Sequence, residues 1–444
     1  MPWYKDKIFW TIFVGAAFIK TLALLCLIHA PLGEQVLVFP DSLGYVYPAQ
    51  TFLTYGHFWE AVTATPLLLR TPGYPLFLAL VQFLTGNMTW AVAAAQNLLS
   101  LFLLIPVYLA TLHVSNRTAA RYSAGFCAAS VLYFSLSFAV LSEIWCVFLL
   151  AWFVQISLRW LEDRRGQNLF LAVLFLVAAV YVRPVAYYFV FVGTLLLGIM
   201  AWCEKSRLIL KQTACYFLLP AVILLGAWHV RNFLTTGYSG FTTVAAYNLY
   251  IWNEDFVARE KGLTVAQAHD ELINALPEDF YQRTPLQQVK TYRQLAKPLL
   301  KKSWRYKLSR VPLWAAKTLL GTNHVHTLRL ILARADEPKN TLNQTEALPR
   351  PWLNSLWERM IFVLSLLQVL GVVIGGFSGL WILLKKRPQA ALFLTAYVCY
   401  FWGISSTFLG TYARFRAPFE FVLCITAGIA IATWTENRSH PKNA

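Results

Sequence analysis

The chain has 444 residues, of which 58% are hydrophobic and only 13% charged, and its formal net charge is +17. This balance excludes a soluble globular domain, because repeated apolar runs of about 20 residues are long enough to cross a bilayer. It also disfavours nucleic acid as a partner, because the basic residues are scattered through short loops and not gathered in one patch.

Ten apolar segments are predicted to cross the membrane as helices, so the fold class is an all-α multi-pass membrane protein. In chain order they are 8–30, 88–112, 118–136, 141–159, 168–183, 185–203, 212–233, 357–384, 389–409 and 415–434. The run 74–85 is too short to cross, and we expect a half-buried or re-entrant helix there. The first run lacks a small-residue cleavage site and is predicted to be a retained span.

Basic clusters in the short turns set the orientation. They are Lys5 and Lys7; Arg117 and Arg121; Arg159, Arg164 and Arg165; Lys205, Arg207 and Lys211; Lys385, Lys386 and Arg387; and Arg438 and Lys442. If 74–85 does not cross, all of them fall on one side, which the positive-inside rule makes the cytoplasm. Two longer segments, 31–73 and 234–356, then lie outside, and the second contains amphipathic stretches at 264–276 and 284–300.

Three parts follow from this topology. Residues 1–233 are predicted to form a transmembrane catalytic module that includes the first outer loop, 31–73. Residues 234–356 form an outer-face loop region with amphipathic helices, which we expect to recognise the acceptor. Residues 357–444 form the C-terminal transmembrane helices and a cytoplasmic tail.

The same topology places eight polar residues near span ends at the outer face. They are Asp41, Arg70, Glu143, Arg183, Arg231, Asn232, Arg414 and Arg416. Outer loops should be poor in arginine, so a bound anion is the simplest reason for this group, and phosphate suits several guanidinium groups. A carboxylate beside the phosphate would take the proton from an attacking hydroxyl, which is worth about 10²- to 10⁴-fold. No nucleotide-binding loop such as GxGxxG is seen.

Six stretches in order carry a resemblance to a known family. They are "DSLGYVYPAQTFLTYG" from Asp41, "RTPGYPLFLAL" from Arg70, "LSE" at 141–143, "YVRP" at 181–184, "WHVRNFLTTGYSGFTTVAAYNLYIWN" at 228–253 and "YARFRAPFE" at 412–420. Over nearly the whole chain they resemble the GT-C superfamily of membrane glycosyltransferases. The similarity is to the bacterial branch related to protein O-mannosyltransferases and the lipid A aminoarabinose transferase.

The resemblance implies a GT-C bundle that transfers one sugar, with inversion, from a polyprenyl phosphate to a hydroxyl of a protein, lipid or glycan acceptor. It implies a bacterial inner membrane and a site on the non-cytoplasmic face. Asp41 maps to the proposed base and Glu143 to a second acid. A single Asp stands where some relatives have an acidic pair, which leaves open whether a divalent metal is used; no other cofactor is expected.

Each candidate residue also has a purely structural interpretation. Asp41 could cap a helix, and Glu143 could be an acid favoured by a helix dipole. The candidate phosphate ligands, Arg70, Arg183, Arg231, Arg414 and Arg416, could contact lipid headgroups. Among the candidate pocket residues, Tyr74 could be an interface anchor, Asn232 could contact lipid headgroups and Asn248 could be a loop-stabilising amide. Lys20, in the middle of the first span, is a functional candidate by its position, with no identifiable partner.

Two rival functions use the same features differently. A lipid-linked oligosaccharide ligase or polymerase would place its outer arginines on a diphosphate carrier. A transporter or flippase would be expected to show repeat symmetry and broken helices at the midplane. No internal repeat is evident, and the polar residues gather at one face, which favours an enzyme.

Overall fold

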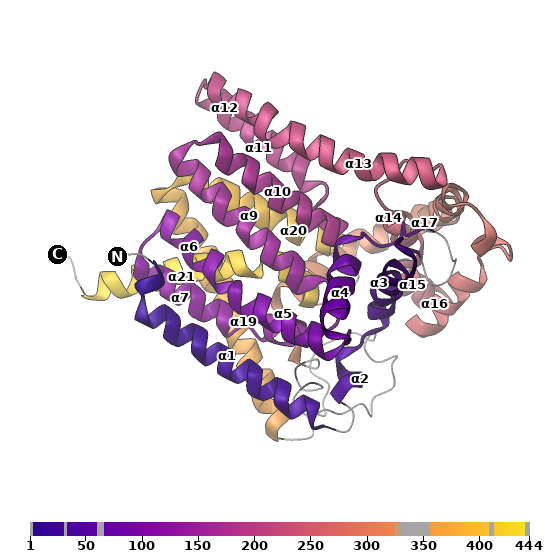
Figure 1. Cartoon of the computed structure of the whole chain (residues 1–444), viewed down its shortest axis with the longest axis horizontal. Helices are drawn as coiled ribbons and strands as arrows, with labels where there is room; N and C mark the ends of the chain where they lie inside the picture. Colours follow the sequence, from indigo (N-terminus) through magenta and orange to yellow (C-terminus); the bar gives the residue numbers. More distant parts are fainter. Residues whose placement is uncertain are drawn as a thin grey trace.

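The computed structural model describes residues 3–30, 33–59, 66–324, 327, 330, 356–407 and 413–439, and within these ranges the regular elements are helices. Figure 1 shows them packed side by side, with both chain ends at one end of the bundle, here called the terminal end. The opposite end is called the distal end. In chain order the α-helices are α1 (Lys7–Ile28), α2 (Gly33–Leu37), α3 (Leu43–Tyr55), α4 (Gly73–Thr85), α5 (Trp90–Phe102), α6 (Leu104–Val114), α7 (Arg117–Ala128), α8 (Val131–Phe138), α9 (Glu143–Asp163), α10 (Gly166–Val182), α11 (Phe189–Cys203), α12 (Arg207–Gln212), α13 (Leu219–Thr236), α14 (Val244–Ile251), α15 (Glu254–Lys261), α16 (Val265–Asn274), α17 (Pro285–Leu320), α19 (Leu356–Lys386), α20 (Pro388–Thr407) and α21 (Ala417–Ser439).

Within the described residues, seven helical segments are long and apolar enough to cross a membrane. They are Lys7–Ile28, Trp90–Val114, Glu143–Asp163, Pro184–Cys203, Arg207–Thr236, Glu358–Lys386 and Ala413–Arg438. The multi-pass membrane fold is therefore confirmed. The other three predicted spans are also helical: α7 and α8 in 118–136, α10 in 168–183 and α20 in 389–409. They fall outside the group of seven, so the number of ten crossings stays a prediction.

The short run 74–85 is helix α4, which has 13 residues. At 1.5 Å per residue it is about 20 Å long, less than the roughly 30 Å of a bilayer core. It begins at the distal end, beside α3 (Figure 1). The prediction that this segment does not complete a crossing is therefore consistent with its length.

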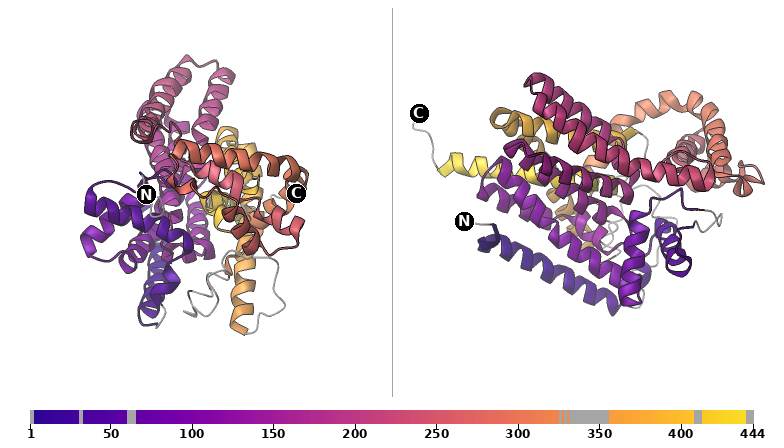
Figure 2. Two further views of the ribbon diagram at one scale, coloured as in Figure 1. Left: turned by 90° about the vertical axis from the view of Figure 1, so that its right-hand side faces the viewer. Right: turned by 45° about the horizontal axis from the view of Figure 1, so that its top comes forward.

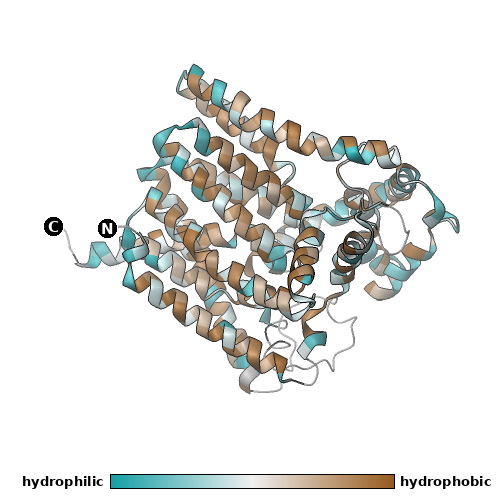
Figure 3. Cartoon of the chain, in the orientation of Figure 1, coloured by the Kyte–Doolittle hydropathy of each residue, from teal (hydrophilic) through white to brown (hydrophobic). Residues whose placement is uncertain are grey.

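The predicted basic turns meet at the terminal end. Asp6, which precedes α1, forms an ion pair with Arg121 of α7 at 2.9 Å. Arg164, after α9, pairs with Glu204 at 3.0 Å and donates a hydrogen bond to Gln389 at 2.8 Å. Figure 3 shows hydrophobic residues along the bundle and hydrophilic ones toward its ends. These contacts place turns that are distant in the sequence on one side of the bundle, as the predicted order of membrane crossings requires.

The distal end carries α2, α3, α4 and the helices α14 to α17, and Figure 2 (left) looks onto it. Helices α14 to α17 share a separate apolar core that includes Leu68 of the first outer segment. The predicted amphipathic stretch 264–276 is α16, which starts with a capping box between Thr264 and Gln267. The stretch 284–300 is also helical, but α17 runs on to Leu320 and has 36 residues. The division of the chain into three functional parts stays a prediction.

Candidate active site

Asp41 lies in a short 3-10 turn, Pro40–Ser42, that leads directly into α3. The hydroxyl of Ser42 fixes this turn, because it donates to the carbonyl of Val140 at 2.8 Å. Each carboxylate oxygen of Asp41 accepts one guanidinium hydrogen bond, from Arg70 at 2.9 Å and from Arg414 at 2.9 Å. The side chain of Asp41 is therefore directed at two arginines and does not act as a helix cap.

Arg70 reaches this point because the segment after it packs tightly on the end of α10. The hydroxyl of Thr71 donates to the carbonyl of Val182 at 3.1 Å. A Cβ atom at Gly73 would lie 2.7 Å from the carbonyl oxygen of Tyr181, which is too close for any residue with a side chain. Glycine, which has no Cβ, allows this close approach of the two backbones. The "RTPG" sequence thus joins the start of α4 to the end of α10, where Arg183 is found.

Glu143 and Arg183 form a second ion pair at 2.5 Å. Glu143 is the first residue of α9, and its side chain is only 4% exposed. A carboxylate at a helix N-terminus is favoured by the helix dipole, but burial at this level requires a charged partner, which Arg183 supplies. Glu143 is therefore a helix-start acid, as the structural interpretation expects, and it also holds Arg183 in place.

Tyr45 and Ser142 connect the two ion pairs, and sequence reasoning did not single them out. The Tyr45 hydroxyl accepts from Arg70 at 3.4 Å and from the Ser142 hydroxyl at 3.2 Å. Ser142 in turn accepts from Arg183 at 3.2 Å. The signal for Tyr45 was present, because it follows Asp41 by four residues and so shares its helix face. We call Asp41, Tyr45, Arg70, Ser142, Glu143, Arg183 and Arg414 the distal cluster.

The distal cluster carries excess positive charge and is open to solvent at one side. Three guanidinium groups face two carboxylates, and the side chains of Asp41, Arg70 and Arg414 are 36%, 25% and 24% exposed. Burial acts to raise the pKa of Asp41, but the charges of Arg414 and Arg70 outweigh it and hold that pKa well below the ordinary value. An anion that enters would find arginines already oriented.

The structure places the remaining two predicted phosphate ligands elsewhere. The Arg416 side chain is 1% exposed and forms an ion pair with Glu420 at 2.6 Å. It also donates to the carbonyls of Leu319 and Gly321 at the end of α17. Arg231 stacks on Trp228 and donates to the carbonyl of Leu67 at 3.1 Å. Both arginines thus hold the backbone of distant segments together, so their geometry does not support the predicted phosphate contact.

Tyr74, one of the three predicted pocket residues, contacts the distal cluster, because its ring packs edge-on against the Tyr45 ring with 5.0 Å between centroids. Tyr74 is fully buried and donates to Gln96 at 2.8 Å. Asn232 is fully buried and donates to the carbonyls of Gly240 and Phe241, so it stabilises the loop after α13 and is not placed for the predicted headgroup contact. Asn248 lies half-buried on α14. None of these three side chains is brought into contact with Asp41 by a recorded hydrogen bond.

Lys20 has the partners that the sequence left unidentified. Its ammonium donates to the hydroxyl of Ser137 at 2.7 Å and to the amide oxygen of Asn97 at 3.3 Å. The ring of Phe134 lies 5.3 Å from it. Polar partners inside the bundle are what an intramembrane lysine requires. Lys20 therefore ties α1 to α5 and α8.

The donors at the distal cluster do not suit a divalent metal. Both oxygens of Asp41 accept from arginines, and Glu143 is paired with Arg183. Hard cations prefer sites where oxygen ligands dominate, whereas cationic groups outnumber the carboxylates here. Within the described ranges, no group of three or more His, Cys, Asp and Glu side chains could hold a metal ion. We therefore derive no step through a metal.

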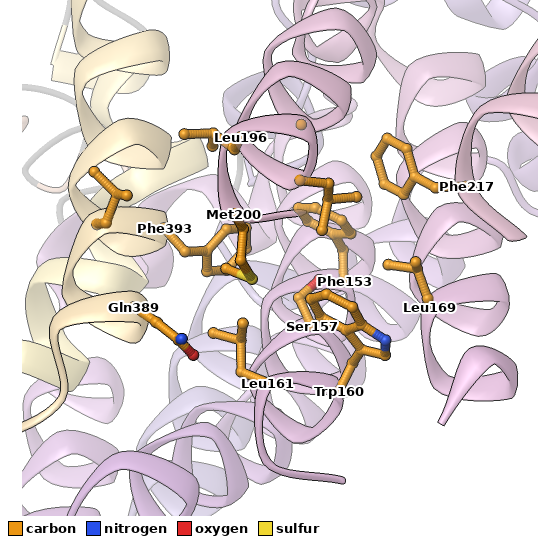
Figure 4. A pocket seen from close by; sticks show the side chains of 13 residues that line it. Phe153, Ser157, Trp160, Leu161, Leu169, Leu196, Met200, Phe217, Gln389 and Phe393 are labelled. Carbon is orange, nitrogen blue, oxygen red and sulfur yellow. The ribbon is translucent and has the colours of Figure 1, made fainter. Parts of the chain in front are cut away.

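An apolar cavity lies farther along α9, among α9, α10, α11 and α20 (Figure 4). Phe153, Trp160 and Met200 are among its lining residues, and its volume is about 40 Å³. One water needs about 10–15 Å³ of such volume, so the cavity has room for only a few waters. Phe153 follows Glu143 by ten residues, or about 15 Å along the helix. The cavity is therefore distinct from the distal cluster.

Comparisons with known proteins agree with this architecture. Residues 69–230 match the family model described as dolichyl-phosphate-mannose-protein mannosyltransferase, a range that contains Arg70, Glu143 and Arg183. No curated protein matches the chain. Among solved structures, the archaeal oligosaccharyltransferase AglB from Archaeoglobus fulgidus, in complex with an inhibitory peptide and a dolichol-phosphate, is similar with a TM-score of 0.55 and 14% identity.

The match to AglB covers 100% of this chain and 53% of that one, so the chain spans about half the length of this relative. An Archaeoglobus fulgidus oligosaccharyltransferase in the apo form gives a TM-score of 0.54 at 15% identity, with the same coverage. ArnT from Cupriavidus metallidurans bound to undecaprenyl phosphate gives a TM-score of only 0.38 at 12% identity, over 96% of this chain and 79% of that chain. The predicted resemblance to the GT-C superfamily and its fold are confirmed.

Proposed function

We propose that this multi-pass membrane protein of GT-C fold is a glycosyltransferase that moves a single sugar from a polyprenyl-phosphate donor to an acceptor hydroxyl at the distal end. The observation that carries the proposal is the carboxylate of Asp41 held between Arg70 and Arg414, with Arg183 nearby and one side open. The matched family is named for dolichyl-phosphate-mannose, and AglB was solved with a dolichol-phosphate. These names support a lipid phosphate as the donor.

The chemistry follows from the charges of the cluster. The donor phosphate binds Arg70, Arg183 and Arg414. The acceptor oxygen attacks the anomeric carbon from the face opposite the phosphate, and the bond from that carbon to the phosphate oxygen breaks, which inverts the configuration. The polyprenyl phosphate leaves with the bonding electrons, and the proton of the acceptor hydroxyl passes to Asp41. Arginines already oriented toward the leaving phosphate stabilise its developing charge.

Donor binding also prepares Asp41 to act as the base. Without donor, two guanidinium groups depress its pKa and make it a weak base. When a phosphate shares the charges of Arg70 and Arg414, the pKa of Asp41 rises toward the ordinary value of about 3.9. A base that strengthens only when the donor is present would limit proton transfer to the productive complex.

Glu143 has a supporting role in this proposal. Its carboxylate is buried beside Arg183 and is too far inside to receive the acceptor proton directly, since only 4% of it is exposed. It fixes Arg183, and Ser142 and Tyr45 extend that support to Arg70. Glu143 is thus proposed as a positioning residue.

The same proposal assigns the sides of the membrane. Basic turns gather at the terminal end, which the positive-inside rule assigns to the cytoplasm. The distal cluster then faces the opposite compartment, which is the periplasmic or extracellular side of a bacterial inner membrane. The acceptor approaches from that side.

The test is sugar transfer in proteoliposomes supplied with a polyprenyl-phosphate sugar. Asp41→Asn should lower turnover by about 10²- to 10⁴-fold, and Asp41→Glu should retain part of it. Asp279→Asn is the matched control, because Asp279 is an exposed acid of the distal region that pairs only with Arg283 in the described contacts. Normal turnover in folded Asp41→Asn protein would rule out the proposed base.

A second arm of the same assay separates the alternative function. Because the fold is similar to that of an oligosaccharyltransferase, a lipid-linked oligosaccharide ligase is the alternative function to test. Donors with a diphosphate linkage are therefore compared with monophosphate donors at equal concentration. Preference for the monophosphate supports single-sugar transfer, and exclusive use of the diphosphate supports the ligase.

A further inference from the structure

Helix α17 has a composition that its position does not explain. Its 36 residues include nine Lys and Arg and no Asp or Glu. It belongs to the distal end and to the long segment 234–356, so the positive-inside rule, which applies to short loops, does not account for its charge. On sequence alone, the basic residues are described as scattered through short loops. That description is wrong for α17, where nine of them lie in one helix. A concentration of cations on this side indicates an anionic partner.

A cleft between α15 and α17 supplies a defined site within this basic region. Its lining residues are Phe256, Arg259, Glu260, Arg305, Tyr306 and Ser309, and its volume is about 470 Å³. This volume lies in the usual range of ligand sites, about 300–1,000 Å³. The site is therefore large enough for one sugar unit with a charged substituent.

The cleft combines an aromatic surface with guanidinium groups. The guanidinium carbons of Arg259 and Arg310 lie 5.2 and 5.4 Å from the centre of the Tyr306 ring. Arg259 and Arg305 are exposed and come from two different helices. Arginine presents a planar fork that matches phosphate or carboxylate, which a lysine does not. Such groups beside a ring suit a sugar that carries an anion.

The single acid in the lining, Glu260, does not oppose this assignment. Tyr306 contacts Arg310 and also hydrogen-bonds to the carboxylate of Asp255, so three arginines face two carboxylates around the cleft. A carboxylate at the margin accepts hydrogen bonds from sugar hydroxyls. Ser309 adds an acceptor, because its hydroxyl already donates to the carbonyl of Tyr306 at 2.7 Å.

We infer that the α15/α17 cleft binds an anionic sugar unit, bearing a phosphate or carboxylate, of the acceptor glycan. This inference rests on the proposed function and names the acceptor class. The cleft is open, but a tyrosine ring lies in it beside guanidinium groups from two helices, an arrangement that suits a single sugar unit carrying an anion. The partner is therefore assigned as a glycan and not as the membrane surface.

Helix α17 also connects the cleft to the distal cluster. Its C-terminal end contacts the segment Ala413–Arg416, which carries Arg414. Arg305 precedes Leu320, the last residue of α17, by fifteen residues, or about 22 Å at 1.5 Å per residue. An acceptor held at both places is consequently extended, with its anionic unit on the order of 20 Å from the reacting hydroxyl. Binding energy from such a remote contact would contribute to transfer at Asp41.

The experiment measures binding of small probes to the full-length protein in phosphatidylcholine nanodiscs. The probes are glucose 1-phosphate, glucuronic acid and uncharged glucose, measured by saturation-transfer NMR. The charged sugars should bind at least tenfold more tightly than glucose. Arg259→Gln/Arg305→Gln should weaken binding of the charged sugars at least tenfold and leave glucose unchanged. Tyr306→Leu should weaken all three probes.

The matched control is Lys297→Gln/Lys301→Gln, which removes two exposed charges of α17 outside the cleft. It should change binding of the charged sugars by less than twofold. Equal losses in the two double variants, or equal binding of charged and neutral sugars, would overturn the inference. Loss of sugar binding when phosphatidylglycerol is added to the nanodiscs would also overturn it, because lipid headgroups would then be the occupant.

The same probes separate this inference from the proposed function. Asp41→Asn should leave binding of the charged sugars unchanged, because Asp41 lies outside the cleft. If transfer depends on Asp41 but the cleft binds no charged sugar, only the inference fails. If the cleft binds charged sugars but no sugar is transferred from any polyprenyl carrier, the proposed function fails by itself.

Discussion

Two arginines that stand two residues apart before α21 have opposite environments. Arg416 and Glu420 are each 1% exposed and pair at 2.6 Å within one turn of helix. Ser130 donates a further hydrogen bond to Glu420. Arg414 pairs at 2.9 Å with Asp41, which is 36% exposed and distant in the chain. The first pair is neutral and closed, whereas the second belongs to a cluster with excess positive charge and an open side.

The difference shows that residue type does not separate a structural arginine from a candidate ligand. Both arginines occur in the same stretch, "YARFRAPFE". Arg416 has its partner four residues away, and its Nη1 donates to carbonyls at the end of α17. Arg414 shares its carboxylate partner with Arg70. An arginine that shares one carboxylate with a second arginine retains charge for a ligand.

The largest expected effect is on stability, at Arg416. Removing one partner of a buried ion pair leaves the other charged and unpaired, which costs about 3–5 kcal/mol. Arg416→Met should therefore lower the melting temperature clearly in nanodiscs. Arg416→Met/Glu420→Leu, which removes both charges, should regain most of the loss. A single variant that melts like the wild type would show that the pair is not structural.

The next effect is on catalysis, at Arg414. Arg414→Gln should lower turnover by about 10²-fold, the usual cost of removing one donor that stabilises developing charge. Its melting temperature should change far less than that of Arg416→Met, because the site is partly open. Turnover in proteoliposomes and melting in nanodiscs are measured on the same preparations. The opposite pattern, with Arg414 needed for folding alone, would reverse the comparison.

A conservative change at Arg70 should have a smaller effect. Arg70→Lys keeps the positive charge but loses the planar fork toward Asp41 and the stacking on the Tyr45 ring, which lies 4.8 Å away. We expect kcat/KM for the donor to fall about tenfold, or about 1.4 kcal/mol. Arg231→Gln is the matched control, because Arg231 contacts a backbone carbonyl outside the cluster. Equal losses at the two positions would argue against a specific phosphate site.

The smallest effect concerns pH. The pKa of Asp41 is depressed in the folded protein, so the stability it contributes is present above its unfolded pKa, about 3.9. That contribution is lost as pH falls through the lower folded pKa. The melting-temperature difference between wild type and Asp41→Asn should stay constant from pH 8 to about 5 and shrink only below about 4. A difference that already shrinks between pH 7 and 6 would contradict the depressed pKa.

Much of the fold was predictable because a bilayer imposes strong rules on sequence. Apolar run lengths located the helices, and the parity of basic turns indicated that 74–85 does not cross, consistent with the 13 residues of α4. The same parity brought Asp41, Arg70, Glu143, Arg183 and Arg414 to one end. These inferences needed only periodicity and charge.

The finer roles depended on tertiary contacts that the sequence does not display. Arg231 and Asn232 hold carbonyls of loops that are distant or irregular. Tyr74 is turned into the core toward Gln96, which lies on another helix. The partners of Lys20 come from α5 and α8. Helix periodicity could have predicted that Tyr45 lies on the same face as Asp41. The α15/α17 cleft could not be predicted from sequence, because it is formed by the packing of two helices.

The most direct test of the central claim is binding of polyprenyl phosphate to the intact protein, measured by native mass spectrometry. Arg70→Gln/Arg414→Gln removes two charges from the distal cluster, and Lys385→Gln/Lys386→Gln removes two from the last turn of α19. If the distal cluster holds the donor phosphate, the first variant loses at least tenfold in affinity and the second binds like the wild type. Equal binding by both variants would contradict the claim.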